Sequence, residues 1–407
     1  MNRANLLKLA STVLTVSALV AACGGGGTDS TTTGTSNSTG TLSLSLTDAP
    51  SCGYDNVFVT VEKVRVHQSS SAGDNDAGWS EVMLAAPQRV DLLTLNNGTL
   101  LPLGQTELPA GTYTQMRLVL GSAPPPGSPA GMMANSIKPS GGDETALTTP
   151  SGQQSGLKMN VNIAVPAGQV VDFAIDFDAC KSFVKAGNSG KYLLKPVLSV
   201  IPIMSSAGQR IVGFVDPSLV KPGTRVSAQF GGASKQSTVP DATGRFVLYP
   251  VSAGTYDLVI TAGGRVNAVM TGVPVADATS TVIGSGAARI NTPFSLASYF
   301  ASGTVTVSGK VVDTGAAVRA TQALDGGPTI EVGYSTANAI TGSYGMTLPA
   351  DAAARLPYVA GATSFAFSNV GQVAGLYRLE ASAPTYTVMT SDITLNTDVT
   401  TNFAFLP

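Results

Sequence analysis

Four aspartates are the side chains of this sequence best suited to hold a metal ion. Asp172, Asp176 and Asp178 follow one another along one segment, and Asp48 lies in a turn after an earlier segment. Clustered hard oxygens suit Ca²⁺, which takes about six to eight of them. Aspartates in such positions also cap turns by accepting backbone N–H bonds. No Asp-x-Asp-x-Asp-Gly loop supports calcium, so no cofactor is expected, and Ca²⁺ stays open as an alternative.

A catalytic centre of the Ser-His-Asp or Cys-His type would have to use His67, the only histidine of the chain. No Gly-x-Ser-x-Gly segment accompanies it, and it is expected on the solvent side of a strand. Ser182-x-x-Lys185 has the spacing found in penicillin-recognising enzymes, but the accompanying Ser-Asp-Asn and Lys-Thr-Gly segments are absent. Glycosidase carboxylates can be far apart in a sequence, and nothing selects a pair here. We therefore expect no catalytic residues and no enzyme.

The first 22 residues have the features of a secretory signal peptide. Arg3 and Lys8 precede a short apolar stretch, and small residues stand before Cys23. The stretch is too short for the ~20 residues of a membrane-spanning helix. A cysteine directly after the cut resembles the lipobox of bacterial lipoproteins, which implies acylation of Cys23 with fatty acids such as palmitate. A signal peptide without lipidation is the alternative. Gly24 at the second mature position implies, by resemblance to known sorting rules, the outer membrane of a Gram-negative cell.

The two remaining cysteines, Cys52 and Cys180, form an even pair in an oxidising compartment. Disulfides persist there, so a Cys52–Cys180 bond is expected, with two buried free thiols as the alternative. Only 12% of the residues are charged and the formal net charge is −2, without a basic stripe. Nucleic acid is therefore not an expected partner.

Period-two alternation predicts an all-β chain. Leu42, Leu44 and Leu46 alternate with polar residues, as in a half-buried strand. In the next strand, 57–67, the alternation slips at Glu62-Lys63, which predicts a β-bulge. Further strands are expected at 116–120, 159–165, 170–177 and 192–202, whereas the Pro-rich region 121–156 is expected to be a mobile insertion, with a functional loop as the alternative.

An internal repeat divides the second half of the chain. The segment 243–250 and the following Ala253-Gly254-Thr255-Tyr256 return as 341–349 and Ala374-Gly375-Leu376-Tyr377, with an insertion at about 350–373. Gly213-x-Val215 and Gly309-x-Val311 precede the two copies. Pro109-Ala110-Gly111-Thr112-Tyr113 matches in the first half, and each tyrosine is expected to pack inward as a structural residue.

Two family resemblances follow from these residues. The stretch Asp241 to Phe246, with Ala253 to Leu258, resembles the carboxypeptidase regulatory-like, prealbumin-like β-sandwich, which implies tandem sandwiches and leaves carbohydrate binding as an implied possibility. Leu46-Thr47-Asp48-Ala49-Pro50, Pro109 to Tyr113, Pro150 to Lys158, Asp176 to Ala179 and Leu194-Lys195-Pro196 resemble the bacterial domain of unknown function 4382, which implies no activity.

These inferences predict five segments: a signal peptide 1–22, a lipidated cysteine with a Gly/Ser/Thr tether 23–40, and sandwich domains at 41–205, 206–295 and 296–407. The expected function is that of a lipid-anchored envelope protein with a binding or structural role. The expected contacts are the membrane, through the lipid, and an envelope protein or polysaccharide. A carbohydrate-binding surface lipoprotein is the alternative, followed by an envelope hydrolase. The binding residues cannot be read from the sequence.

Overall fold

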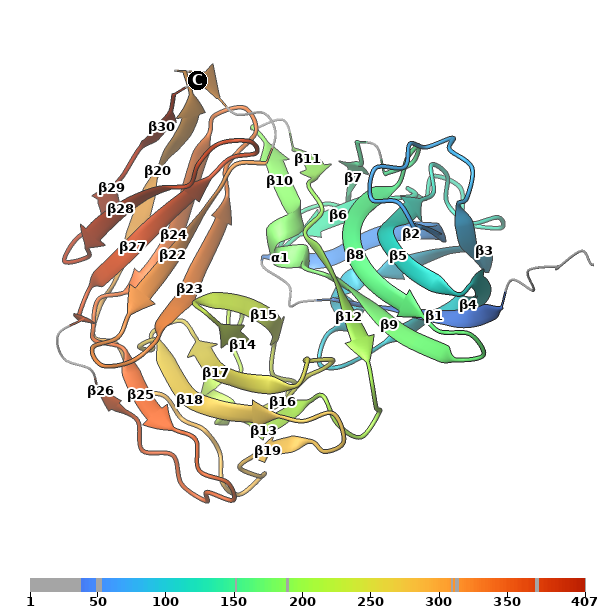
Figure 1. The fold of residues 1–407 in the computed structure, drawn as a ribbon. Helices are drawn as coiled ribbons and strands as arrows, with labels where there is room; N and C mark the ends of the chain where they lie inside the picture. Colours follow the sequence, from blue (N-terminus) through green and yellow to red (C-terminus); the bar gives the residue numbers. More distant parts are fainter. Residues whose placement is uncertain are drawn as a thin grey trace, which may run out of the picture. The chain divides into compact units, whose positions relative to one another are not determined.

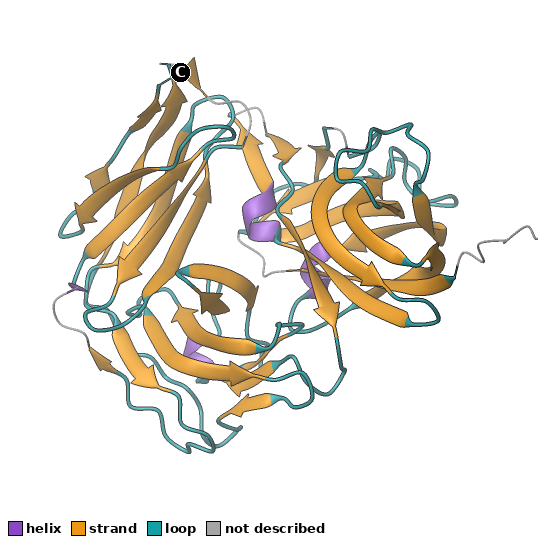
Figure 2. Cartoon of the chain, in the orientation of Figure 1, coloured by secondary structure: helices purple, strands orange, loops and turns teal. Residues whose placement is uncertain are grey.

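The chain is all-β, as its alternation predicted. The computed structural model describes residues 38–48, 53–150, 152–187, 190–308, 310–311, 315–369 and 373–406. Strands and their connecting loops make up nearly all of these residues, and the helical turns among them are short (Figures 1 and 2). Tandem β-sandwiches account for all three large hydrophobic cores of the described residues.

The first sandwich consists of two sheets around a core that runs from Leu42 to Leu194. One sheet has the order β12-β9-β1-β4 and the other contains β3-β2-β5-β8, extended beyond β2 by β6, β7, β11 and β10. The strands are β1 (Thr39–Asp48), β2 (Tyr54–His67), β3 (Ser80–Asp91), β4 (Leu101–Pro109), β5 (Gly111–Leu120), β6 (Ser136–Pro139), β7 (Thr145–Thr148), β8 (Leu157–Val165), β9 (Val170–Phe177), β10 (Phe183–Ala186), β11 (Lys191–Leu194) and β12 (Leu198–Ile203). The helical turns are η1 (Leu92–Leu95) and α1 (Ala179–Ser182).

The local predictions for this sandwich are mostly confirmed. The leucines of β1 are buried, and the register of β2 shifts between Val61 and Lys63 against both β3 and β5, as expected of the bulge. The region 121–156 is a different case, because β6 and β7 lie in the sheet and Asn135 is buried. The expectation of a mobile insertion was therefore wrong for residues 136–148, since short strands inside it find an open sheet edge to pair with.

The second and third sandwiches repeat the strand order of the first. The second has sheets β16-β13-β19 and β15-β14-β17-β18, with the 3₁₀ turn η2 (Pro217–Leu219). The third has β20 between β24 and the final strands, and β23-β22-β27-β28. Their strands are β13 (Ile211–Phe214), β14 (Arg225–Phe230), β15 (Ala233–Thr238), β16 (Arg245–Leu248), β17 (Gly254–Thr261), β18 (Ala268–Val275), β19 (Thr281–Ile283), β20 (Ser298–Val307), β21 (Lys310–Val311), β22 (Ala317–Ala323), β23 (Thr329–Thr336), β24 (Ser343–Pro349), β27 (Leu376–Ser382), β28 (Met389–Thr394), β29 (Val399–Thr400) and β30 (Phe403–Phe405).

In all three sandwiches the opening strand pairs antiparallel on one side and parallel on the other. β1 lies between β4 and β9, β13 between β16 and β19, and β20 between β24 and the pair β29 and β30. The opposite sheet has the orders β3-β2-β5-β8, β15-β14-β17-β18 and β23-β22-β27-β28. The chain therefore contains one sandwich topology three times.

The structure corrects the register of the internal repeat. Gly213 pairs with Phe246, and it is Gly303, rather than Gly309, that pairs with Tyr344. Val215 and Val305 each donate a backbone hydrogen bond to the repeat glycine, at 2.8 Å to Gly244 and 2.9 Å to Gly342. Gly303-Thr304-Val305 is therefore the counterpart of Gly213-Phe214-Val215.

The tyrosines of the Ala-Gly-x-Tyr segments pack inward, as expected. Tyr113, Tyr256 and Tyr377 are all buried at the start of the third strand of their sheets. Tyr113 and Tyr256 each donate a 2.9 Å hydrogen bond to the carbonyl four residues earlier, at Pro109 and Ser252. This shared geometry satisfies the hydroxyl at the rim of each core.

The insertion of the third sandwich extends a sheet of the second. β25 (Ala354–Pro357) pairs parallel with β18, and β26 (Ser368–Asn369) pairs with β25. Tyr358, Phe365 and Phe367 pack against the core of the second sandwich. Across the described residues, no helix has the length and apolar character needed to cross a membrane.

Candidate functional site

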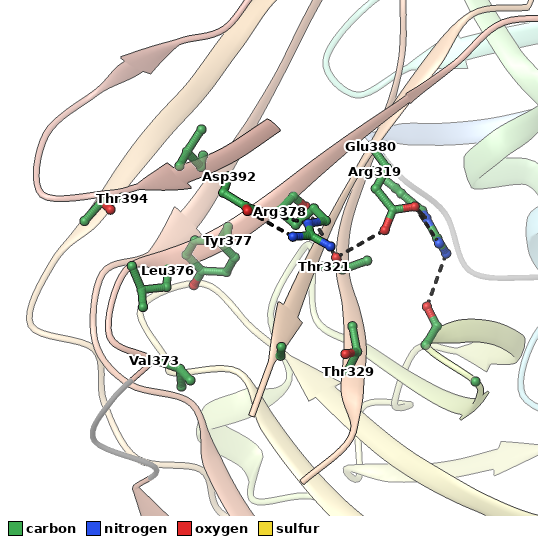
Figure 3. A pocket seen from close by; sticks show the side chains of 14 residues that line it. Arg319, Thr321, Thr329, Val373, Leu376, Tyr377, Arg378, Glu380, Asp392 and Thr394 are labelled. Atoms are coloured by element: carbon green, nitrogen blue, oxygen red, sulfur yellow. Dashed lines mark hydrogen bonds and ion pairs between the residues drawn. The ribbon is translucent and has the colours of Figure 1, made fainter. Parts of the chain in front are cut away.

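A pocket of about 620 Å³ lies on the outward face of the sheet β23-β22-β27-β28. Its volume falls within the range of about 300–1,000 Å³ typical of small-molecule sites. Figure 3 shows the side chains that line it. The floor comes from β22, β27 and β28, because alternate residues of a strand point to the same face. The turn between β14 and β15 contributes Gly231 and Gly232. The sheet-face pocket, as we name it, is lined by Gly231, Gly232, Arg319, Thr321, Ala323, Thr329, Val373, Leu376, Tyr377, Arg378, Glu380, Asp392, Ile393 and Thr394.

Two cross-strand ion pairs cross the floor of the sheet-face pocket (Figure 3). Arg319 donates through Nε and Nη2 to Glu380 Oε2, at 2.9 and 2.7 Å. Arg378 donates through Nε and Nη2 to the two carboxylate oxygens of Asp392, at 2.7 and 2.9 Å. The two hydrogen bonds between Arg378 and Asp392 lower the pKa of Asp392 and raise the pKa of Arg378. All four charged groups are therefore paired, and their charges sum to zero.

Several polar atoms of this pocket have few partners among the described residues. Glu380 Oε1 has one contact among the described residues, a long 3.5 Å hydrogen bond from Thr321 Oγ1. Arg378 uses Nε and Nη2 for Asp392, and its Nη1 has no partner among the described residues. Arg319 Nη1 donates to the carbonyl of Gly232 at 3.2 Å, which joins the turn to the floor. The pocket thus presents donors and acceptors without a histidine, cysteine or serine in its lining.

The four aspartates proposed for calcium do not come together. Asp176 and Asp178 line one pocket of about 240 Å³ with Lys181, whereas Asp172 lines another groove beside β8 and β12. Asp48 accepts a hydrogen bond from the backbone of Ala179, and Asp178 caps α1 through Lys181 N. Asp48 and Asp178 therefore accept backbone hydrogen bonds, as capping residues do. The described residues contain no group of three or more side chains that could hold a metal ion.

Asp176 is the most perturbed carboxyl of the set. Burial, together with the charge of Asp178, raises its pKa to about 7. Its hydrogen bonds, from Gln236 Nε2 and Ser199 Oγ, are long, at 3.4 and 3.5 Å. Gln236 belongs to β15 of the second sandwich, which explains why an outward-facing residue of β9 is buried.

The other predicted chemical residues serve local structure. His67 accepts a 2.8 Å bond from Ser69 N, and its Nε2 lies 3.0 Å from the carbonyl of Ala77. Its ring packs 5.1 Å from that of Trp79. Ser182 is buried at the end of α1 and accepts a hydrogen bond from Val197 N, whereas Lys185 lies exposed in β10.

The cysteines are only partly described. Cys23 and Cys52 lie outside the described residues, so lipidation of Cys23 stays a prediction. Cys180 lies in α1 and is disulfide-bonded. The identity of its partner as Cys52 is likewise a prediction.

A buried polar junction joins all three sandwiches at Glu331 of β23. Its carboxylate accepts a 2.7 Å hydrogen bond from Lys181 Nζ of α1. Its backbone exchanges two bonds with the side-chain amide of Gln229 of β14, at 2.7 and 2.8 Å. Burial raises the pKa of Glu331, but the charges of Lys181 and Arg225 outweigh this effect and hold it below its usual value.

Sequence reasoning missed the sheet-face pocket. The one signal available in the sequence was the alternation Arg378-x-Glu380 in a strand whose other residues are mostly apolar. Arg319 and Asp392 lie at matching positions of the neighbouring strands. Those matches depend on strand register, which the sequence does not display.

Comparison with known proteins assigns the first sandwich to a family. Residues 39–196 match the family model described as domain of unknown function (DUF4382). This match confirms the resemblance on which the first domain was predicted. No curated protein matches the chain.

The chain is similar to several solved structures. A mutant type II cohesin–X-dockerin complex from Acetivibrio cellulolyticus is 21% identical, over 22% of this chain and 59% of that one, with a TM-score of 0.19. A second mutant of that complex and the Bacillus anthracis TIE protein are matched over 53% and 51% of their chains, so this chain spans little more than half of these relatives. The Streptococcal ancillary pilin is 10% identical, over 90% of this chain and 99% of that one, with a TM-score of 0.17.

Proposed function

We propose that this chain is a non-catalytic binding protein of the cell envelope, attached to the outer membrane of a Gram-negative bacterium through lipid on Cys23. The sheet-face pocket is its ligand-binding site. Its partner is an envelope component, either a polysaccharide or a protein.

The pairing of every charged group in the sheet-face pocket carries this proposal. Arg319 is paired with Glu380, and Arg378 is paired with Asp392. Catalytic acids and bases need a pKa near the working pH and a reacting partner within hydrogen-bond reach. Each guanidinium and carboxylate of the pocket is instead engaged by its partner, and together they form a polar surface suited to recognition.

The binding role is tested with a residue that blocks the pocket. Ala323 is exposed at the end of β22 and lines the sheet-face pocket. Ala323→Trp would fill the pocket, and tryptophan is well tolerated in strands. Ala404→Trp is the matched control, because Ala404 is exposed on β30, in the opposite sheet of the same sandwich.

The purified protein is sedimented with isolated envelopes, and the bound fraction is measured. We expect retention of the unaltered protein and of Ala404→Trp, and loss of retention for Ala323→Trp. The proposed site is contradicted if the envelopes retain all three proteins equally, or if they retain none of them.

Anchoring and the absence of catalysis are tested separately. Cys23→Ser should move the protein from the membrane fraction to the soluble fraction, and mass spectrometry should find acyl chains on the unaltered protein. Turnover of an ester, peptide or glycoside that disappears on replacing His67, Asp172, Asp176 or Asp178 would make the protein an enzyme instead.

A further inference from the structure

We infer that the ligand of the sheet-face pocket is an uncharged molecule rich in hydroxyl groups, such as a neutral oligosaccharide. This inference rests on the proposed function, because it names the ligand class of the same site. It is carried by the charge balance and by the hydrogen-bonding atoms that the ion pairs leave over.

The charge balance of the pocket disfavours an ionic ligand. Each guanidinium lies beside a carboxylate, in the pairs Arg319–Glu380 and Arg378–Asp392. An anion drawn to either arginine would face the neighbouring carboxylate, and a cation drawn to either carboxylate would face the neighbouring arginine. The repulsion between these like charges cancels the attraction that drew the ionic ligand to the pocket. A neutral ligand meets no such penalty.

The remaining hydrogen-bonding atoms favour hydroxyl groups. Arg378 and Glu380 are two residues apart on β27 and therefore share one face, about 7 Å apart along the strand. Arg378 Nη1 can only donate, and Glu380 Oε1 can only accept. A hydroxyl donates and accepts at once, so a row of hydroxyls on one ligand can satisfy both atoms. Figure 3 shows Arg378 and Glu380 on the pocket floor.

The rest of the lining suits the faces of a sugar ring. Thr329 and Thr394 are exposed and supply further hydroxyls at the two sides of the pocket. Leu376 is 44% exposed at the end of β27 and offers an apolar contact. A pyranose ring presents both hydroxyls and C–H groups, so it matches a lining of this mixed character.

The turn from the second sandwich leaves room for a ligand of this size. Gly231 has a φ of +61° and nothing within 4 Å of the position that a Cβ would take. Gly232 follows with a φ of +73° and accepts the hydrogen bond from Arg319. Two glycines allow this left-handed turn, and they border the pocket without side chains.

The test is calorimetric titration of the purified protein with defined tetrasaccharides. The neutral probes are maltotetraose, cellotetraose and tetra-N-acetylchitotetraose, and the charged probes are tetragalacturonate and tetraglucosamine. We expect binding of at least one neutral probe, with the charged probes weaker by about tenfold or more, which corresponds to one decade in Kd. Because no net charge is involved, the affinity for the neutral probe should change by less than about twofold between about 50 and 500 mM NaCl.

Variants localise the binding. Ala323→Trp should abolish it, Arg378→Gln should weaken it by about tenfold through loss of a charged donor, and Ala404→Trp should leave it unchanged. Tighter binding of a charged probe, no binding of any neutral probe, or neutral binding that survives Ala323→Trp overturns the inference. If envelope retention is nevertheless lost in Ala323→Trp, the ligand class is wrong and the binding role stands. If envelope retention is unaffected as well, both proposals fail.

Discussion

Replacing Glu331 with glutamine tests whether the buried junction holds the sandwiches together. Glu331 is 7% exposed, and its carboxylate lies 2.7 Å from Lys181 Nζ, with Arg319 3.5 Å away. Glu331→Gln keeps the shape and a hydrogen-bond acceptor, but it leaves Lys181 as a buried cation that has lost its closest partner. Removing one partner of a buried pair costs about 3–5 kcal/mol.

The lower end of that range applies here. Lys181 has a second acidic neighbour, Asp178, at 3.9 Å, which offsets part of the loss. We therefore expect Glu331→Gln to lower the free energy of unfolding by about 3 kcal/mol. The double variant with Lys181→Met should be less destabilised than the sum of the two single variants, with a coupling of about 1–3 kcal/mol, because both charges then leave together.

The assay combines urea unfolding with hydrogen–deuterium exchange. Exchange is followed in peptides that cover α1 and β23, which belong to different sandwiches. Glu331→Gln should speed exchange in both, since the ion pair links them. Asp392→Asn, which breaks an exposed pair, is the control and should shift neither the unfolding midpoint nor the exchange. A Glu331→Gln protein as stable as this control, or faster exchange in β23 alone, would refute the role of Glu331 as a link.

The remaining predictions concern titration, backbone and covalent structure. Burial and the charge of Asp178 raise the pKa of Asp176 to about 7. Between about pH 4 and 7 the folded state therefore keeps a proton on Asp176 that the unfolded state has lost, so the free energy of unfolding should fall as the pH rises through this range. Asp176→Asn should flatten this dependence and raise the melting temperature at pH 8 more than at pH 4, and parallel melting curves would contradict it. Gly244→Ala should lower the stability measured by urea unfolding far more than Gly264→Ala does. Both glycines have a positive φ, but only at Gly244 would an added Cβ overlap a backbone carbonyl, which is that of Val215. A Cys52–Cys180 bond should appear as one linked peptide pair in non-reducing mass spectrometry, and recovery of Cys52 as a free thiol would exclude it.

Much of the fold could be predicted from local patterns. Alternation is a property of neighbouring residues, and it located β1 from Leu42, Leu44 and Leu46 as well as the bulge of β2. The inward packing of Tyr113, Tyr256 and Tyr377 also followed, since their segments repeat with the same turn residues. The resemblance of the first domain to its family was also read from short local motifs, and the family match over residues 39–196 confirms it.

The candidate site could not be predicted in this way. Arg319, Arg378 and Asp392 lie on three strands, and only the hydrogen-bond register of the sheet makes them neighbours. Register also decided that Gly303 is the counterpart of Gly213, although Gly309 begins a similar tripeptide.

The sequence by itself determined that this chain is all-β, where several strands of the first sandwich run and which of their faces are apolar, because hydrophobic periodicity acts within a single strand. Only the tertiary structure decided which polar residues meet. Asp176 is a polar residue of β9, yet β15 of the second sandwich covers it, and this burial, together with the charge of Asp178, raises its pKa. The sheet-face pocket likewise needs a turn from one sandwich beside the sheet of another. Burial and electrostatic environment depend on the distance between groups in space, and chain position does not specify that distance until the sheets have packed.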